Sequence, residues 1–173
     1  MLRKGFQRLL QTDATGSTVL VRVAVGFVFL TSGIVKFIFE NQGEGRFLKL
    51  GFQAPEATAY FVGGVEIAAG ALLLLGLLTR LAAIPLVIDM LVAIGTSKLP
   101  LLFGPGPEPV SAAPKVGFWA FAYVARLDIT MLLLVSFLLV AGAGAYSIDA
   151  WLLRRLTAAP RRSIDVALPS LAG

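Results

Sequence analysis

Residues 59–79 read AYFVGGVEIAAGALLLLGLLT, and this stretch decides the fold because it is apolar enough to cross a bilayer and yet contains a carboxylate, Glu66. At about 1.5 Å of rise per residue, a helix of this length spans ~31 Å, the thickness of a hydrocarbon core. A charge near mid-membrane costs ~2.5 to 3.5 kcal/mol on insertion scales, so Glu66 should face the protein interior and have a partner. On a helical wheel Ala59, Gly63 and Gly70 lie on the same face as Glu66. Small residues let helices approach closely, so this face is predicted to be the interior of a bundle.

The composition of the whole chain indicates a membrane protein. The 173 residues are 57% hydrophobic and only 14% charged, and the mean hydropathy is +0.85, far too apolar for a soluble domain. We therefore predict an all-α fold, an integral membrane bundle of four transmembrane helices. The expected spans are at about residues 18–39, 59–79, 81–98 and 118–146. They form one membrane domain, residues 1–150, followed by a basic cytoplasmic tail, residues 151–173.

The distribution of positive charge predicts the orientation. The net charge is +5, but the basic residues collect at the ends of apolar segments, where they orient a protein in a membrane, so no nucleic-acid partner is expected. With four spans, both termini and the tight turn at Arg80 share one side, which carries eight Lys and Arg residues against four on the other. The positive-inside rule places both termini in the cytoplasm. We expect a multi-pass protein of a bacterial-type inner membrane, surrounded by lipid.

The absence of two residue types limits the chemistry. The chain has no Cys and no His, which excludes haem, iron–sulfur clusters and zinc held by those side chains, and also thiolate or imidazole catalysis. No metal site is predicted. Redox chemistry would therefore need an organic cofactor, a quinone or a partner subunit.

Glu66 is one of six ionisable residues in the predicted spans. The others are Arg22, Lys36, Asp89, Arg126 and Asp128. Left unpaired, the six would cost on the order of 15 to 20 kcal/mol, so most must be paired or neutralised. Their depths place all but Arg22 from mid-membrane outward, in the half away from the cytoplasm.

Helical spacing predicts where several of these side chains point. Arg22 and Lys36 share a face with two glycines, which favours the bundle interior, although cations near helix ends also commonly extend to the two interfaces. Asp89 shares a face with Pro85, whose ring should kink the third span. Arg126 and Asp128 lie about 200° apart on a wheel, so both cannot face the same neighbour.

The two connectors away from the termini differ in character. Residues 40–58 are polar, and the portion 46–52 is expected to form a short interfacial helix. Residues 99–114 contain five prolines and two glycines, which predict a loop.

Two interpretations of the charged residues stay open. One is a structural network of ion pairs, since buried pairs can act as specificity devices. The other is a quinone site, because a quinone headgroup needs hydrogen-bond donors at its carbonyls and a proton path, and intramembrane ionisable residues are by default functional candidates. In that case the catalytic, proton-exchanging residues are Glu66, Lys36 and Asp89. The residues expected to bind the quinone are Arg22, Lys36, Glu66, Arg126 and Asp128.

Two motifs point to a family. The first span reads Arg22-x3-Gly26-x2-Phe29-x3-Gly33-x2-Lys36, and the second reads Glu66-x3-Gly70-x3-Leu74-x-Gly76-x2-Thr79-Arg80 and runs at once into another span. Together they resemble the DoxX/DoxD family of small four-helix membrane proteins, over roughly residues 19–143. The resemblance implies a membrane subunit of an oxidoreductase complex, with thiosulfate:quinone oxidoreductase the namesake activity and other protein subunits as partners. It also implies that Arg22, Lys36 and Glu66 occupy charged positions of the family pattern and that Arg80 lies in its cytoplasmic turn.

A different class of function competes with the quinone-linked one. A non-catalytic membrane anchor or assembly subunit would use the connectors, residues 40–58 and 99–114, to dock its partner in a larger membrane complex. A small-solute or proton transporter is less favoured, because four spans form a narrow bundle and the two halves show no clear inverted repeat.

Overall fold

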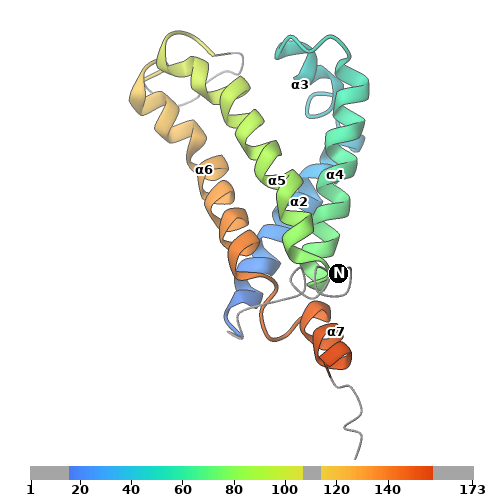
Figure 1. Cartoon of the computed structure of the whole chain (residues 1–173). Helices are drawn as coiled ribbons and strands as arrows, with labels where there is room; N and C mark the ends of the chain where they lie inside the picture. Colours follow the sequence, from blue (N-terminus) through green and yellow to red (C-terminus); the bar gives the residue numbers. More distant parts are fainter. Residues whose placement is uncertain (1–15, 107–113, 158–173) are drawn as a thin grey trace, which may run out of the picture.

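Four long helices run up and down beside one another in the computed structural model, which describes residues 16–106 and 114–157 (Figure 1). They are α2 (Thr18–Ile38), α4 (Pro55–Leu75), α5 (Thr79–Ala93) and α6 (Phe118–Ala141). Two shorter helices are α3 (Glu44–Lys49) and α7 (Ile148–Thr157). Four candidate spans are long and apolar enough to cross a membrane, and the described residues contain no strand, so the predicted all-α membrane fold is confirmed.

The third span is built from three kinds of helical turn. After α5 the chain continues through a π-helical turn (Ile94–Lys98) and a 3₁₀ turn (Leu99–Leu102), which extend the span to Leu102. The first four residues of the expected loop at 99–114 are therefore helical. Residues 107–113 of that loop lie outside the described residues, as do residues 1–15 and residues 158–173 of the expected tail.

Three helix ends differ from the expected positions for local reasons. Helix α4 begins at Pro55, four residues early, because proline is well suited to the first turn of a helix. It stops at Leu75 because Gly76 adopts the left-handed conformation with φ of 65°. Helix α6 ends at Ala141 rather than near residue 146, because Gly142 and Gly144 have φ of 81° and 83°.

Helices α2 and α4 approach each other backbone to backbone along a stripe of glycines. A Cβ placed on Gly70 would lie 2.7 Å from Leu30 N and 2.9 Å from Gly26 O, and one on Gly33 would lie 2.7 Å from Gly63 O. No side chain larger than hydrogen fits at these positions without moving a backbone. The face of α4 that carries Gly63, Glu66 and Gly70 is buried, as its small residues predict.

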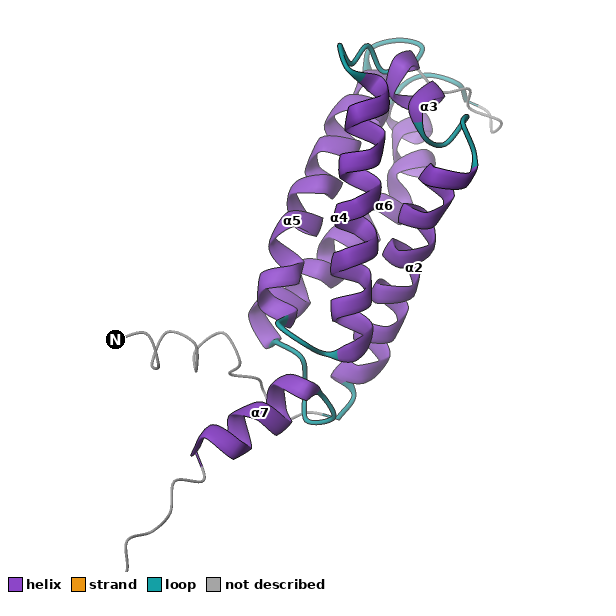
Figure 2. Cartoon of the chain, turned by 90° about the vertical axis from the view of Figure 1, so that its right-hand side faces the viewer, coloured by secondary structure: helices purple, strands orange, loops and turns teal. Residues whose placement is uncertain are grey.

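The bundle has two distinct ends. The terminal end contains the start of α2, the turn between α4 and α5, and α7. The connector end contains α3, Leu99–Leu102 and the start of α6. Figure 1 shows α5 and α6 leaning away from α2 and α4 toward the connector end, while Figure 2 shows the helices side by side from the perpendicular direction.

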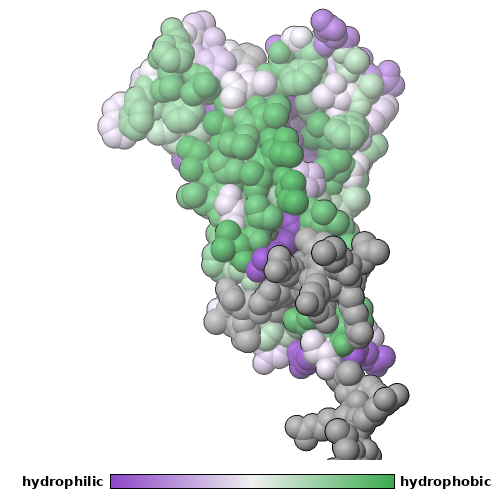
Figure 3. All heavy atoms as spheres, viewed as in Figure 1, coloured by the Kyte–Doolittle hydropathy of each residue, from purple (hydrophilic) through white to green (hydrophobic). Residues whose placement is uncertain are grey.

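The most deeply buried side chains lie along the middle of the bundle and toward its terminal end. They include Val25, Phe29, Leu73, Leu86, Val135 and Leu138. Apolar residues also cover most of the side of the spans seen in Figure 3, and many large apolar side chains are exposed, as expected for a surface in contact with lipid. The protein therefore has an apolar core and an apolar outside, and its polar groups are gathered at particular depths.

The glycine stripe gives a direct test of the packing. Gly70→Ala is expected to force α2 and α4 apart and to destabilise the protein by about 1 to 3 kcal/mol, the usual cost of overpacking. The matched control is Gly64→Ala on the exposed face of the same helix, where an added Cβ meets no atom within 4 Å. Thermal unfolding in detergent should show a lower Tm for Gly70→Ala only. Equal Tm values for the two variants would contradict the packing described here.

Candidate functional site

The ion pair between Lys36 and Glu66 joins α2 to α4 inside the bundle. The Lys36 ammonium donates a hydrogen bond to Glu66 Oε2. The glycine contact described above lies one helical turn before each residue, since Gly33 precedes Lys36 by three positions and Gly63 precedes Glu66 by three. This close approach brings the two side chains within reach. Glu66 is only 3% exposed, and Lys36 is the partner that a buried carboxylate is predicted to have.

Asp89 of α5 is the next member of the site. Its carboxyl group interacts electrostatically with Lys36, Arg46 and Asp128, and also with the Glu66 carboxyl. Two neighbouring carboxyl groups can form a hydrogen bond with each other only when one of them carries a proton. Asp89 Oδ2 is buried and accepts no hydrogen bond from the described residues. The site therefore combines a place for a proton with a vacant acceptor.

These groups surround a cavity of about 150 Å³ at the connector end. We call it the charged pocket; its ionisable lining residues are Lys36, Arg46, Glu66, Asp89 and Asp128. The lining also includes four residues with hydroxyl side chains, Ser32, Thr58, Thr96 and Ser97. Three carboxyl groups thus face two cations within one small space, with all four spans contributing.

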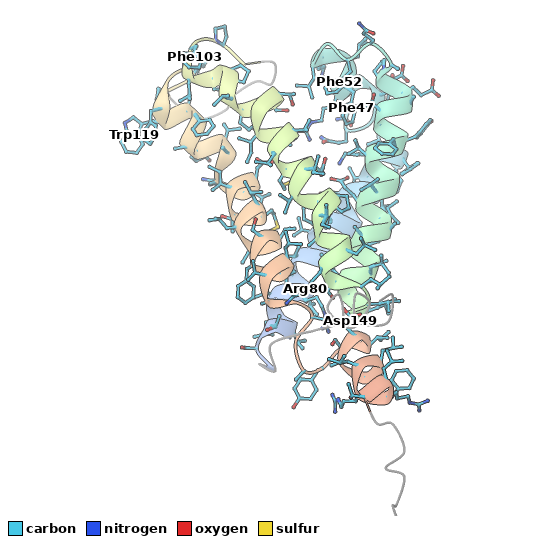
Figure 4. All side chains as sticks on the ribbon, viewed as in Figure 1. Phe47, Phe52, Arg80, Phe103, Trp119 and Asp149 are labelled. Carbon is cyan, nitrogen blue, oxygen red and sulfur yellow. The ribbon has the colours of Figure 1, made fainter. Side chains whose placement is uncertain are left out.

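Helix α3 covers the charged pocket. Arg46, Phe47 and Phe52 all line the cavity, and the two phenylalanine rings pack edge to face with centroids 5.4 Å apart. Figure 4 shows both rings beside α3 at the connector end. The helix expected within residues 46–52 forms at Glu44–Lys49, and it turns Phe47 inward, where this side chain is 8% exposed. Sequence reasoning missed these three lining residues, although two aromatic residues in an otherwise polar connector were a usable signal.

The π-helical turn lies at the rim of the same pocket. Thr96 and Ser97 belong to Ile94–Lys98 and line the cavity, and the Thr96 hydroxyl donates to Val92 O at 2.8 Å. Such turns recur at functional sites in helical proteins. The third span therefore combines a proline, a half-buried carboxylate and a π turn within a short length.

Arg22 lies at the other end of the bundle. Its guanidinium donates to Ala143 O at 2.5 Å and to Tyr146 O at 2.8 Å, and it interacts electrostatically with Asp149. It precedes Lys36 by 14 positions on one helix, about 21 Å along the axis. The structure therefore does not bring Arg22 into the charged pocket with Lys36 and Glu66, and its role in the fold is to hold the segment after α6.

Asp149 holds the start of α5 from a distant part of the chain. Its carboxylate accepts hydrogen bonds from Leu78 N at 2.7 Å and Thr79 N at 3.0 Å, while its own N–H donates to Gly76 O at 2.9 Å. It thereby satisfies two N–H groups at the helix start, next to Leu78 with its positive φ of 49°. Figure 4 labels Asp149 at the start of α7. Sequence reasoning missed Asp149, because nothing in α7 itself shows which helix it caps.

Arg126 and Asp128 point in different directions, as the wheel predicts. Asp128 lines the charged pocket, whereas Arg126 is exposed, and its guanidinium carbon lies 4.0 Å from the centroid of the Tyr123 ring. The structure therefore brings Asp128, but not Arg126, together with Lys36, Glu66 and Asp89. Across residues 16–106 and 114–157, no group of three acidic side chains has the arrangement needed to hold a metal ion.

Fold and site together define a four-span helical membrane protein with a charged pocket inside its bundle. The model of the DoxX family matches residues 17–103, a range that includes Lys36, Glu66 and Asp89. An uncharacterised membrane protein of Mycobacterium tuberculosis (strain ATCC 25618 / H37Rv) is 45% identical over 156 residues, which cover 90% of this chain and 93% of the relative. The chain belongs to the DoxX family. No solved structure matches it.

The ion pair should show strong energetic coupling. Lys36→Met leaves the buried Glu66 carboxylate without its cation and is expected to destabilise the protein by about 3 to 5 kcal/mol. In the double variant Lys36→Met, Glu66→Leu both charges are gone, and most of the lost stability should return. Thermal unfolding of the two single variants and the double variant measures the coupling. Additive effects would show that the pair is not formed.

The capping role of Asp149 predicts a separate effect at the terminal end. Asp149→Ala removes the acceptor for one buried and one part-buried N–H group and should cost about 1 to 2 kcal/mol, comparable with the loss of a helix cap. It should also speed proteolytic cleavage between α6 and α7. Glu56→Gln, an exposed change in the first turn of α4, serves as the control and should alter neither Tm nor cleavage. Unchanged cleavage in Asp149→Ala would contradict the role.

Proposed function

We propose that the charged pocket binds a quinone headgroup and exchanges protons with it, and that the protein is the quinone-interacting membrane subunit of an oxidoreductase complex. The observation that carries the proposal is the Lys36–Glu66 pair beside Asp89 in a small cavity with aromatic walls. Reduction of a quinone to a quinol takes up two electrons and two protons. The pocket contains carboxyl groups that can supply or accept these protons.

The size and lining of the pocket suit such a headgroup. A cavity of about 150 Å³ is large enough for one six-membered ring, as engineered cavities of that volume that bind benzene illustrate. Lys36 and Arg46 supply N–H donors for carbonyl oxygens, and Phe47 and Phe52 offer flat apolar surfaces for a ring. Glu66 and Asp89 supply carboxyl groups that can pass a proton to or from the ligand oxygen.

The electrons must come from outside this chain. Without Cys or His, the chain lacks the ligands that usually hold haem or an iron–sulfur cluster. The proposal therefore requires a partner subunit that carries a redox centre. The excess of Lys and Arg at the terminal end supports cytoplasmic termini in an inner membrane, which puts the charged pocket in the outer half and the partner at the connector end.

Quinone binding by purified protein tests the proposal. Protein purified in mild detergent should retain quinone, identified by mass spectrometry of the extracted lipids. Glu66→Gln, Lys36→Met and Asp89→Asn should each weaken binding of added quinone about 10- to 100-fold, the loss of one charge-assisted hydrogen bond. Arg126→Gln is the matched control, since Arg126 lies outside the charged pocket, and it should bind as tightly as the wild type.

The opposite result has a definite meaning. If the folded Glu66→Gln and Lys36→Met variants bind quinone as the wild type does, the charged pocket is not the quinone site. The protein would then act as a non-catalytic membrane anchor or assembly subunit, with its ion pairs serving only the fold.

A further inference from the structure

An apolar cavity adjoins the charged pocket between α4 and α5. Its volume is about 270 Å³, and it shares the lining residues Val62, Asp89 and Val92 with the charged pocket. The rest of its lining comes from Phe61, Val65, Pro85 and Ile88. Asp89 is the one polar residue in that lining, and it stands where the two cavities meet.

A third cavity continues this space toward the terminal end. It measures about 250 Å³ and shares Val65 and Pro85 with the second. Its remaining lining is apolar and consists of Ala68, Ala69, Leu72, Leu81 and Ala82. We call the two together the α4–α5 groove. On α5 it extends from Val92 to Leu81, which is about 16 Å along the helix.

The α4–α5 groove lies at the surface that faces lipid. Phe61 is 72% exposed, and Ile88 and Leu81 are 56% and 48% exposed, so its rim is open to the hydrocarbon region. Alanines and Pro85 line its floor where larger side chains would fill the space. This helix pair contrasts with α2 and α4, whose glycine stripe leaves no room.

We infer that the α4–α5 groove is a lateral entrance from the bilayer, and that it holds the polyprenyl tail of the ligand whose headgroup lies in the charged pocket. The inference rests on the proposed function and adds the chemical class of the ligand: a quinone with a long isoprenoid chain. Because Asp89 lines both spaces, the two cavities adjoin, and one molecule can place its polar head among the charges and its tail in the groove.

The depth of Asp89 favours such a ligand over a phospholipid. Asp89 lies ten residues into the span Thr79–Leu102, about 15 Å from its start, near the middle of the hydrocarbon core. A phospholipid places only acyl chain at that depth, because its headgroup stays at the interface. A neutral quinone ring can enter the core and reach the carboxyl group there.

A variant that fills the groove tests this inference. Val65→Trp adds bulk to both groove cavities, and Val65 is not among the residues that line the charged pocket. In lipid nanodiscs its affinity for a long-tailed quinone should fall at least tenfold relative to the wild type, while affinity for a tail-less quinone stays within twofold. Leu133→Trp, on an exposed position of α6, is the control and should change neither.

A labelling experiment covers the case in which Val65→Trp does not fold. Since the chain has no cysteine, Ile88→Cys supplies a single thiol at the rim of the groove. A lipid-soluble maleimide should label it, and the long-tailed quinone should slow labelling at least fivefold, whereas the tail-less quinone should not.

The outcomes separate the two proposals. Equal loss of both quinones in Val65→Trp, loss of neither, or labelling of Ile88→Cys that neither quinone slows would overturn the groove. The groove would also be overturned if Val65→Trp lowered the amount of co-purified phospholipid and left the binding of both quinones unchanged. Failure of the proposed function is a different result. In that case the wild type would bind neither quinone, or Glu66→Gln would bind both as tightly as the wild type does.

Discussion

The contact between Lys36 and Glu66 is the interaction on which the interior of this bundle depends. Glu66 is tolerable inside a membrane only with a nearby positive charge, and the charge reaches it only because α2 and α4 touch through glycine backbones one turn away. The close packing of the two helices and the pairing of the two charges therefore depend on each other. A larger residue in the glycine stripe would separate the helices and would also part the charges.

The two ends of the bundle have different tasks. At the terminal end, Arg22 and Asp149 bind backbone groups of the turns, and Arg80 donates to Val140 O, so polar side chains there close the helix ends. At the connector end the charged side chains instead surround a cavity, and α3 covers it. Charges of the same type therefore bind backbone groups at one end of the bundle and line a cavity at the other.

Much of this arrangement follows from local patterns in the sequence. Span length and composition predict the four helices, small residues predict the buried face of α4, and the angle between Arg126 and Asp128 predicts that they separate. A helical wheel gives the direction in which a side chain leaves its helix, but it does not identify the residue that the side chain meets on a neighbouring helix. Arg22 and Lys36 share a face of α2, but they are 14 positions apart along the helix and therefore contact different parts of the protein.

The missed residues depend on contacts between segments far apart in the chain. Phe47 and Phe52 line the pocket because the connector folds back over it, and Asp149 caps a helix that begins 70 residues earlier in the sequence. The sequence pattern within α3 or α7 does not predict these contacts, because each contact depends on where the whole helix lies in the bundle. Such residues become visible only when the tertiary structure is known.

The balance of charge around the pocket also favours some molecules over others. Three carboxyl groups and two cations give the site a net negative charge when every carboxyl is ionised, no net charge when one is protonated and a net positive charge when two are. With all three carboxyl groups ionised, the net negative charge in a medium of low dielectric constant opposes the entry of an oxyanion but not that of an uncharged ring. The protonation state of the carboxyl groups therefore sets how strongly the cavity discriminates between anionic and neutral molecules.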